Sequence, residues 1–282
     1  MGSISDAIIV AGGHGTRMLP ASATVAKEAL PLVDVPIIVH LAREAVNAGV
    51  KRIHIVSNPA KDLSEILSDN THFAKHRPDI TKDLLNPAGE VQIIHHTQLE
   101  QKGLGDAIQT ALGTIEGPYL VLLGDNLLMD AHGSISSYAP SNASRLLVET
   151  YERTGKPCSA IIEVDDPSLY GIVSIEGEQI TEIVEKPQEN PPSNLALCGR
   201  YLFDSDSAAL LEQFAHHGEL ASIALQQYLI DEGRLIGVEL RGYQWYDSGS
   251  PNLWLKSQID HALRRSDLSE DLVDWLNTRL QR

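Results

Sequence analysis

The alternation of strand and helix patterns in the first half of the chain constrains the fold most. Four short strand patterns, the first of them typical of a buried strand, alternate with segments of helical spacing. We expect strands over 6–11, 52–57, 91–95 and 119–123, and helices over 36–48, 62–68 and 104–112. Because parallel strands need a crossover that is usually helical, this order predicts a parallel sheet with helices on both faces.

The second half of the chain is more mixed. Strand patterns fall at 158–164, 171–175, 180–184, 197–203 and 235–240, and helical spacing at 144–153, 205–214, 220–231, 252–265 and 268–280. No repeat or clear linker divides the sequence. We therefore expect one α/β domain, 1–282, with a Rossmann-like, mostly parallel mixed sheet flanked by helices. It would comprise a first half over 1–130, a smaller α+β portion over 131–250 and a helical tail over 251–282.

Charge and cysteine content narrow the function classes. The chain carries 22 Lys and Arg against 38 Asp and Glu, a net charge of -16, which argues against broad binding to nucleic acid or an anionic membrane. A small anionic ligand remains compatible, since it needs only local donors. No apolar run reaches membrane-spanning length, and we expect no signal peptide. Cys158 and Cys198 are expected to be small core residues, which favours a reducing compartment such as the cytoplasm.

A glycine-rich turn follows the first strand. Gly12, Gly13 and Gly15 let backbone N–H groups approach a phosphate, and Arg17 and Lys27 add positive charge nearby. On spacing alone, a tight turn with two solvated cations explains the segment equally well. A dinucleotide fingerprint would need a third glycine where Met18 stands, which disfavours a nicotinamide-dependent dehydrogenase. The chain also has no Gly-Lys-Ser or Gly-Lys-Thr triplet of a Walker loop.

Two segments carry a family resemblance. GGHGTRMLP at 12–20, followed by KEALPLVDVPII at 27–38, resembles the sugar-1-phosphate nucleotidylyltransferases, and bacterial UTP–glucose-1-phosphate uridylyltransferases in particular. Matching positions recur in order as far as Leu255. The resemblance implies transfer of a nucleotidyl group from an NTP to a sugar 1-phosphate, with Mg²⁺ as cofactor. It also implies a homodimer or homotetramer, in which the tail after Leu268 would either form an interface or cover the core.

The resemblance also implies roles for individual residues. The catalytic cations would be Arg17, Lys27 and Lys186. The nucleotide would be bound by Ala11, Gly12, Gly13, Gly15, Thr16, Gln98, Gly103 and Gly105. The sugar would be bound by Gly171, Glu185, Gly199 and Tyr201, and the metal by Asp125 and Asp247.

General chemistry is consistent with several of these roles. Asp125 follows the fourth strand, and ligands bind at the carboxyl ends of strands in open parallel sheets. Mg²⁺ prefers carboxylate oxygens, although a lone Asp more often caps a turn. Gln98 offers a donor and an acceptor to a uracil or thymine edge, although on its own it would be taken for a surface residue. Glu185 and Lys186 would bind sugar hydroxyls and the sugar phosphate; without the resemblance they would be a surface ion pair.

Some positions depart from the family pattern, and some polar residues receive no role. Ala26 stands where a proline is usual, Asp106 replaces a histidine or glutamine, and Ala221-Ser222 begin a segment that differs beside the sugar pocket. The nucleobase and the sugar are therefore open: a thymidylyltransferase, or an enzyme for another sugar or a cyclitol phosphate, is the alternative. A second alternative, of another class, is a non-catalytic regulatory protein that binds sugar nucleotides. The pairs His95-His96 and His216-His217 are not expected to bind metal, because adjacent side chains do not share a face.

Overall fold

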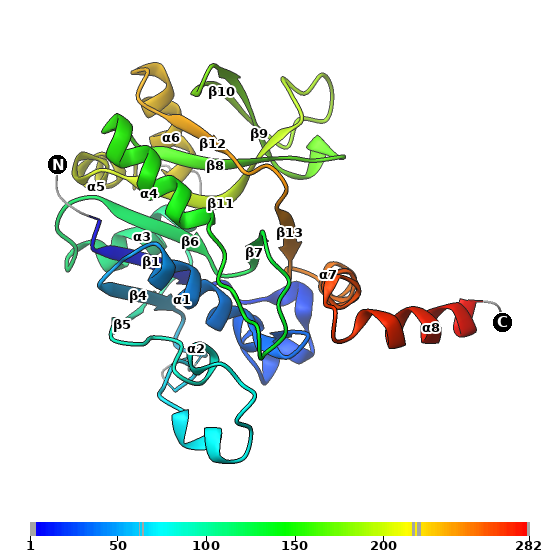
Figure 1. Ribbon diagram of the computed structural model, residues 1–282. Helices are drawn as coiled ribbons and strands as arrows, with labels where there is room; N and C mark the ends of the chain where they lie inside the picture. Colours follow the sequence, from blue (N-terminus) through cyan, green and yellow to red (C-terminus); the bar gives the residue numbers. More distant parts are fainter. Residues whose placement is uncertain (1–3, 62, 64, 216–217, 219–220, 281–282) are drawn as a thin grey trace.

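The strands of the first half form one parallel block. The computed structural model describes residues 4–61, 63, 65–215, 218 and 221–280. Its nine-stranded sheet has the order β5-β4-β1-β6-β11-β8-β12-β10-β9 (Figure 1). The first four strands in that order are parallel: β5 (Gln92–Thr97), β4 (Arg52–Ser57), β1 (Asp6–Ala11) and β6 (Tyr119–Leu123). The expected bounds of β1, β4 and β6 are confirmed.

The second half of the sheet is mainly antiparallel. β11 (Leu195–Phe203) runs antiparallel to β6 and joins the two halves. Beyond it lie β8 (Cys158–Glu163), β12 (Ile236–Glu239), β10 (Gln179–Glu185) and β9 (Gly171–Glu176). Of the described pairings in this half, only β12 with β8 is parallel. The expectation of a mixed α/β sheet is confirmed.

Helices cover both faces of the sheet, because its central strands are apolar on both sides. Ile9 of β1 packs in the hydrophobic cluster on one face and Ile8 in the cluster on the other. The first cluster includes residues of α1 (Ile37–Asn47) and α4 (Ala143–Thr154). The second includes α3 (Leu104–Leu112), α5 (Ser205–Gln213) and α6 (Ala221–Asp231). The predicted bounds of α3 are reproduced and those of α1 differ by one residue at each end.

The tail consists of α7 (Pro251–Arg264) and α8 (Ser269–Leu280). The Ser250 hydroxyl accepts a hydrogen bond from Leu253 N at 3.4 Å, and Pro251 is the first helical residue, so α7 has a well-formed start. Figure 1 shows α8 extending away from the sheet, and none of its residues is buried, so it does not cover the core. No helix in the described ranges is both long and apolar enough to cross a bilayer.

Short elements account for most of the differences from expectation. A separate pair, β7 (Asn126–Met129) with β13 (Gln244–Asp247), was not expected, nor were β2 (Pro31–Leu32), β3 (Val35–Pro36) and α2 (Lys82–Leu85). Of the helix expected over 62–68, positions 62 and 64 lie outside the described residues, and 65–68 form turns, with Ser68 N donating to Glu65 O at 3.1 Å. A helix of fewer than two turns is not stable by itself, so helical spacing over seven residues is weak evidence for a helix.

The prediction that both cysteines are core residues is confirmed. Cys158 and Cys198 are fully buried free thiols, and burial raises the pKa of Cys198 to about 12. His216-His217 lie outside the described residues, as does Leu220, the first residue of the expected helix over 220–231. Within the part of the chain that is described, no three His, Cys, Asp or Glu side chains gather as a metal site.

Candidate active site

The site begins where β6 ends beside β1. Gly124 N donates to Val10 O at 2.9 Å, which places the Gly124-Asp125 turn against the carboxyl end of β1. A Cβ on Gly124 would lie 2.6 Å from Val10 O, so only glycine allows this close approach. The turn therefore carries Asp125 to the edge of the sheet where the glycine loop also emerges.

Gly124 gives the first prediction. We expect Gly124→Ala to lower the melting temperature and the activity together, because backbone atoms of β1 and β6 would have to separate to admit the methyl group. Gly113→Ala is the matched control, since a Cβ at Gly113 meets no heavy atom within 4 Å. Thermal unfolding and turnover of both variants test this. Equal stability of the two variants would contradict the close approach.

The small β7–β13 sheet brings Asp247 to Asp125. Asp247 is paired with Asn126 across the two strands, and the Ser248 N–H and hydroxyl donate to Asp125 O at 3.0 and 3.1 Å. Gly249 N donates to Asp247 Oδ1 at 2.5 Å and orients that carboxylate. Two aspartates from distant parts of the sequence therefore meet through strand pairing, as a shared metal site requires.

Lys27 contacts Asp125 and is itself held by buried charges. Its Nζ forms an ion pair with Asp125 Oδ2 and lies 3.9 Å from Glu28 Oε1. Glu28 is buried and accepts from Lys61 Nζ at 3.0 Å. Burial raises the pKa of the Glu28 carboxyl, while the charges of Lys27 and Lys61 oppose that rise. Sequence reasoning assigned no role to Glu28 or Lys61; the adjacent Lys27-Glu28 pair was the available signal.

Arg17 approaches the second aspartate. A Cβ on Gly249 would lie 2.7 Å from Arg17 Nη2 and 2.8 Å from Asp247 Oδ1, so both groups flank this glycine. Burial is the main cause that raises the pKa of Asp247, and the charge of Asp125 adds to it, whereas the Gly249 N–H, Arg17 and Lys27 lower it. Four of the predicted charged groups, two anions and two cations, thus influence one another at one edge of the sheet.

Asp247 gives a prediction on stability. Because its pKa is raised in the folded state, its contribution to the free energy of unfolding is present at low pH and is lost as pH rises through the folded pKa. We therefore expect Asp247→Asn to melt at a higher temperature than the wild type at neutral pH while losing activity. Thermal unfolding from pH 4 to pH 8 tests this, with Asp231→Asn at an exposed position as control. A lower melting temperature for Asp247→Asn at neutral pH would contradict it.

A cavity of about 350 Å³ opens beside these groups. Its lining includes five predicted residues: Gly13, Lys27, Gln98, Gly103 and Asp125. It thus joins the glycine loop, the strip that follows β5 and the end of β6. The volume is at the lower end of the range for small-molecule sites.

Side chains fix the carbonyl groups of the glycine loop. Gly12 follows Ala11, the last residue of β1, and its carbonyl accepts from Asn58 Nδ2 at 2.8 Å and from Gln101 Nε2. The Gly15 carbonyl, which precedes the short helix Thr16–Met18, accepts from Ser22 Oγ at 2.7 Å. Gly13 and His14 donate no backbone hydrogen bond to any described residue, which leaves their N–H groups available to a phosphate.

Gly103 and Gly105 begin α3 but have different surroundings. Gly103 precedes the helix, has a φ of 95° and lines the cavity. Gly105 is buried, and a Cβ there would lie 2.8 Å from Ala221 Cβ on α6. The structure therefore places the Gly105 α-carbon in a helix–helix contact rather than on the cavity wall. The departure at Ala221 lies in the same contact.

The predicted sugar residues gather around the β9–β10 hairpin and β11. Glu185 is paired with Gly171, and Lys186 N donates to Tyr170 O at 2.9 Å. Lys186 Nζ lies 3.6 Å from Glu185 Oε1, with both side chains exposed, and Lys186 does not line the cavity that contains Lys27. Tyr201 is buried on β11, and burial, with the charges of Cys198 and Glu185, raises its pKa.

Gly199 links this group to the nucleotide side of the site. It has a φ of 76° and lies where the pairing of β11 with β8 shifts register, between Leu197 and Tyr201. A Cβ there would lie 3.1 Å from Leu123, which lines the 350 Å³ cavity. The bulge on β11 thus contacts the wall of the cavity.

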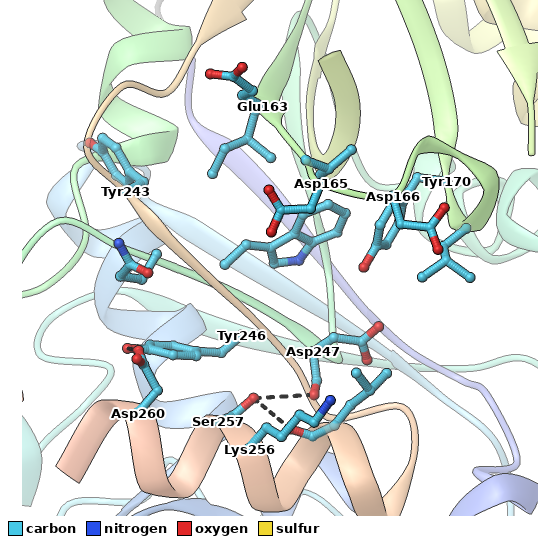
Figure 2. A pocket seen from close by; sticks show the side chains of 16 residues that line it. Glu163, Asp165, Asp166, Tyr170, Tyr243, Tyr246, Asp247, Lys256, Ser257 and Asp260 are labelled. Atoms are coloured by element: carbon cyan, nitrogen blue, oxygen red, sulfur yellow. Dashed lines mark hydrogen bonds between the residues drawn. The ribbon is translucent and has the colours of Figure 1, made fainter. Parts of the chain in front are cut away.

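A second cavity, of about 610 Å³, lies between the end of β8, β13 and α7 (Figure 2). Tyr170 and Asp247 line it, and the Tyr170 ring lies 4.6 Å from that of Trp245. Asp125 lines the first cavity and Asp247 the second, so the carboxylate pair lies between them. This larger cavity was not expected from the sequence, because it depends on the unexpected strand β13.

Helix α7 forms hydrogen bonds with two segments of the site, strand β13 and the segment that follows Lys27. Ser257 Oγ donates to Asp247 O at 3.4 Å, and Tyr246 OH donates to Asp260 Oδ2 at 2.7 Å. Gln258 Nε2 donates to Pro31 O at 2.7 Å, on the segment that follows Lys27. The helix therefore contacts both the strand that carries Asp247 and the segment that carries Lys27.

A buried ion pair supports the same region from inside. Arg200 Nε and Nη2 donate to the two carboxylate oxygens of Glu44 at 2.8 and 2.9 Å, and both side chains are at most 2 % exposed. Arg200 Nη2 also donates to Asn126 O at 2.8 Å, and Ser144 Oγ donates to Glu44 Oε1 at 2.6 Å. The pair thus joins α1, α4 and β11 to the residue after Asp125. Sequence reasoning missed it, although an arginine inside an apolar strand pattern was the signal.

The fold and the site define a nucleotidyltransferase, and the chain belongs to the nucleotidyl transferase family, whose sequence profile matches residues 6–262. It is 31% identical to UTP–glucose-1-phosphate uridylyltransferase 1 of Streptococcus pyogenes serotype M1, over 98% of this chain and 94% of that protein. It is 32% identical to UTP–glucose-1-phosphate uridylyltransferase 2 of Staphylococcus saprophyticus, over 98% of each chain.

Solved structures agree with this assignment. The UTP-bound UGPase from Acinetobacter baumannii superposes with a TM-score of 0.79 at 27% identity, over 97% of this chain and 98% of that one. A UDP-glucose pyrophosphorylase complexed with UDP-glucose gives a TM-score of 0.76 at 28% identity, over 92% of this chain and 98% of that one. The resemblance expected from the glycine loop and the KEALP segment is thus confirmed.

Proposed function

We propose that this nucleotidyltransferase transfers UMP from UTP to glucose 1-phosphate, giving UDP-glucose and pyrophosphate. The observation that carries the proposal is the convergence of Asp125, Asp247, Arg17 and Lys27 beside a cavity lined by the glycine loop and Gln98. The two UTP–glucose-1-phosphate uridylyltransferases that match this chain over nearly its full length support the same substrates. A thymidylyltransferase, or an enzyme for another sugar or cyclitol phosphate, is the alternative within this class.

The donor set fits Mg²⁺. Asp125 and Asp247 supply hard carboxylate oxygens, and the described residues add no third His, Cys, Asp or Glu to them. Such a sparse set suits an ion that keeps several waters and takes phosphate oxygens as its other ligands. When bound by these two aspartates, Mg²⁺ supplies positive charge that neutralises the reacting phosphates.

The remaining catalysis is positioning and charge neutralisation. An oxygen of the sugar phosphate is the nucleophile, and it is already anionic near neutral pH, so no general base is needed. The N–H groups of the glycine loop, with Arg17 and Lys27, bind the triphosphate. Their positive charge offsets the repulsion within the triphosphate and between it and the sugar phosphate. Holding the two polyanions in line for attack on the α-phosphorus then accounts for most of the acceleration. No covalent intermediate or redox cofactor is required.

The β9–β10 side of the site is assigned to the sugar phosphate. Glu185 would accept hydrogen bonds from sugar hydroxyls, and Lys186 would hold the phosphate. A Cβ at position 171 would lie 2.9 Å from Glu185 Oε2. Glycine at this position therefore avoids a clash with the Glu185 carboxylate. Tyr201 and Gly199, on β11, are assigned to the sugar as well. Because the side chains of Glu185 and Lys186 are exposed, both can reorient toward a ligand.

A turnover panel tests the proposal. Pyrophosphate release is measured for UTP, TTP, CTP and ATP, each with glucose 1-phosphate and with other sugar and cyclitol phosphates. We expect the highest kcat/KM for UTP with glucose 1-phosphate, loss of activity with a chelator, and recovery on adding excess Mg²⁺. Release that is unaffected by chelation would exclude the metal assignment. Binding of UTP without release for any acceptor would favour a non-catalytic sugar-nucleotide-binding protein instead.

A further inference from the structure

The Gln98 side chain is held in one orientation. It is 5% exposed, and its amide nitrogen donates to Asp106 Oδ2 at 2.6 Å and, more weakly, to Gly103 O at 3.4 Å. A carboxylate and a carbonyl are both acceptors only, so the NH₂ group must face them. Turning the amide by 180° would place its oxygen against the Asp106 carboxylate, where it would be repelled.

The opposite end of the amide is free to bind a ligand. Gln98 lines the 350 Å³ cavity, and its Oε1 lies 2.5 Å from the position of a Cβ on Gly12. No described residue donates a hydrogen bond to Oε1. Its lone pairs are therefore available to a donor group on a ligand. The cavity therefore presents an acceptor at a fixed place, while the amide nitrogen is directed at Asp106 and Gly103.

Uracil and cytosine differ in the order of these groups along their pairing edge. Uracil offers N3–H as a donor next to O4 as an acceptor, whereas cytosine offers N3 as an acceptor next to an N4 amino donor. With its oxygen toward the base, a glutamine amide accepts from the uracil N3–H and is repelled by the cytosine N3. Rotation exchanges its oxygen and nitrogen and reverses this preference. An amide that rotates freely accepts both bases, and one that is fixed accepts only one.

We propose that Asp106 is a specificity-determining residue, which fixes the Gln98 amide with its oxygen toward the base N–H and so selects uracil over cytosine. The inference rests on the proposed function in taking the 350 Å³ cavity as the base site. Asp106 acts through Gln98 and is a positioning residue.

The test is the ratio of the dissociation constants of CTP and UTP, measured by calorimetry on the full chain. Asp106→Asn has the same shape, but its amide can satisfy Gln98 in either orientation. We expect the ratio to fall by about tenfold or more, because a mispaired buried group no longer opposes cytosine. Glu100→Gln is the matched control: it removes an exposed carboxylate from the same segment and should leave the ratio unchanged.

A second variant shows whether Asp106 acts through Gln98. In a Gln98→Ala background, adding Asp106→Asn should no longer change the ratio. Asp106 also lies in the first turn of α3, and loss of its charge there would lower the melting temperature and affect both nucleotides equally. The ratio is therefore a readout that a merely structural role would not move.

The outcomes separate this inference from the proposed function. An unchanged ratio in Asp106→Asn, or an equal change with Gln98 absent, overturns the role of Asp106 and leaves the enzymatic proposal intact. If the wild type binds UTP but releases no pyrophosphate, the enzymatic proposal fails, and the ratio still decides the role of Asp106. A wild type that binds neither nucleotide overturns both.

Discussion

Replacing Asp125 with Asn should lower kcat by on the order of 100-fold or more, because a neutral amide binds Mg²⁺ poorly and Lys27 loses its carboxylate partner. The fold should survive, since the bonds from Ser248 to this residue go to its backbone carbonyl at 3.0 and 3.1 Å. The measurement is pyrophosphate release across a Mg²⁺ titration, with circular dichroism as a check on folding. We expect the half-saturating Mg²⁺ concentration to rise as well.

A matched control separates the metal role from a general loss of charge. Asp231 is exposed on α6, outside both cavities, and Asp231→Asn should keep wild-type turnover. Wild-type turnover of Asp125→Asn at ordinary Mg²⁺ concentrations would show that this aspartate does not bind the ion. The assignment of Asp247, which depends on its proximity to Asp125, would then fail too.

Replacing Arg200 with Met should give the largest loss of stability, roughly 3–5 kcal/mol in the free energy of unfolding. Glu44 would remain buried without a cation, and Asn126 O would lose its hydrogen bond. Urea unfolding followed by circular dichroism measures the change. Turnover should fall with stability, because the pair supports the residue that follows Asp125.

Two further variants make this result specific. Arg153 forms an exposed pair with Glu178 at 2.8 Å, and Arg153→Ala should change the free energy of unfolding little, since solvent screens such pairs. Adding Glu44→Gln to Arg200→Met should restore part of the stability, because it removes the uncompensated charge. A loss no larger than that of Arg153→Ala would show that the buried pair contributes little.

Strands β1 and β6 of the parallel half could be predicted because they are buried and read as continuous apolar runs. Ile8 and Ile9 pack on opposite faces of β1, so neither position could be polar. The β7–β13 pair could not be predicted, since each strand is four residues long and its partner is far away in the chain. Local spacing carries no information on such pairings.

The candidate site was predictable where the family resemblance supplied residues, and not where only packing reveals them. Asp125, Asp247, Arg17 and Lys27 lie together as the motifs implied. Glu28 and Lys61 resemble surface charges in the sequence, and only the fold shows that their side chains are buried. Gly105 was assigned to the nucleotide, whereas its α-carbon packs against α6.

Helix α7 lies outside the large sheet, and the sequence alone predicts only a helical tail over 251–282. Its hydrogen bonds to Asp247 O and Pro31 O instead tie together segments more than two hundred residues apart in the chain. A truncated enzyme that ends before Pro251 would therefore lose the hydrogen bonds that hold the strand of Asp247 near the segment of Lys27. A chain shortened for expression or crystallisation should keep this helix and lack residues only beyond it.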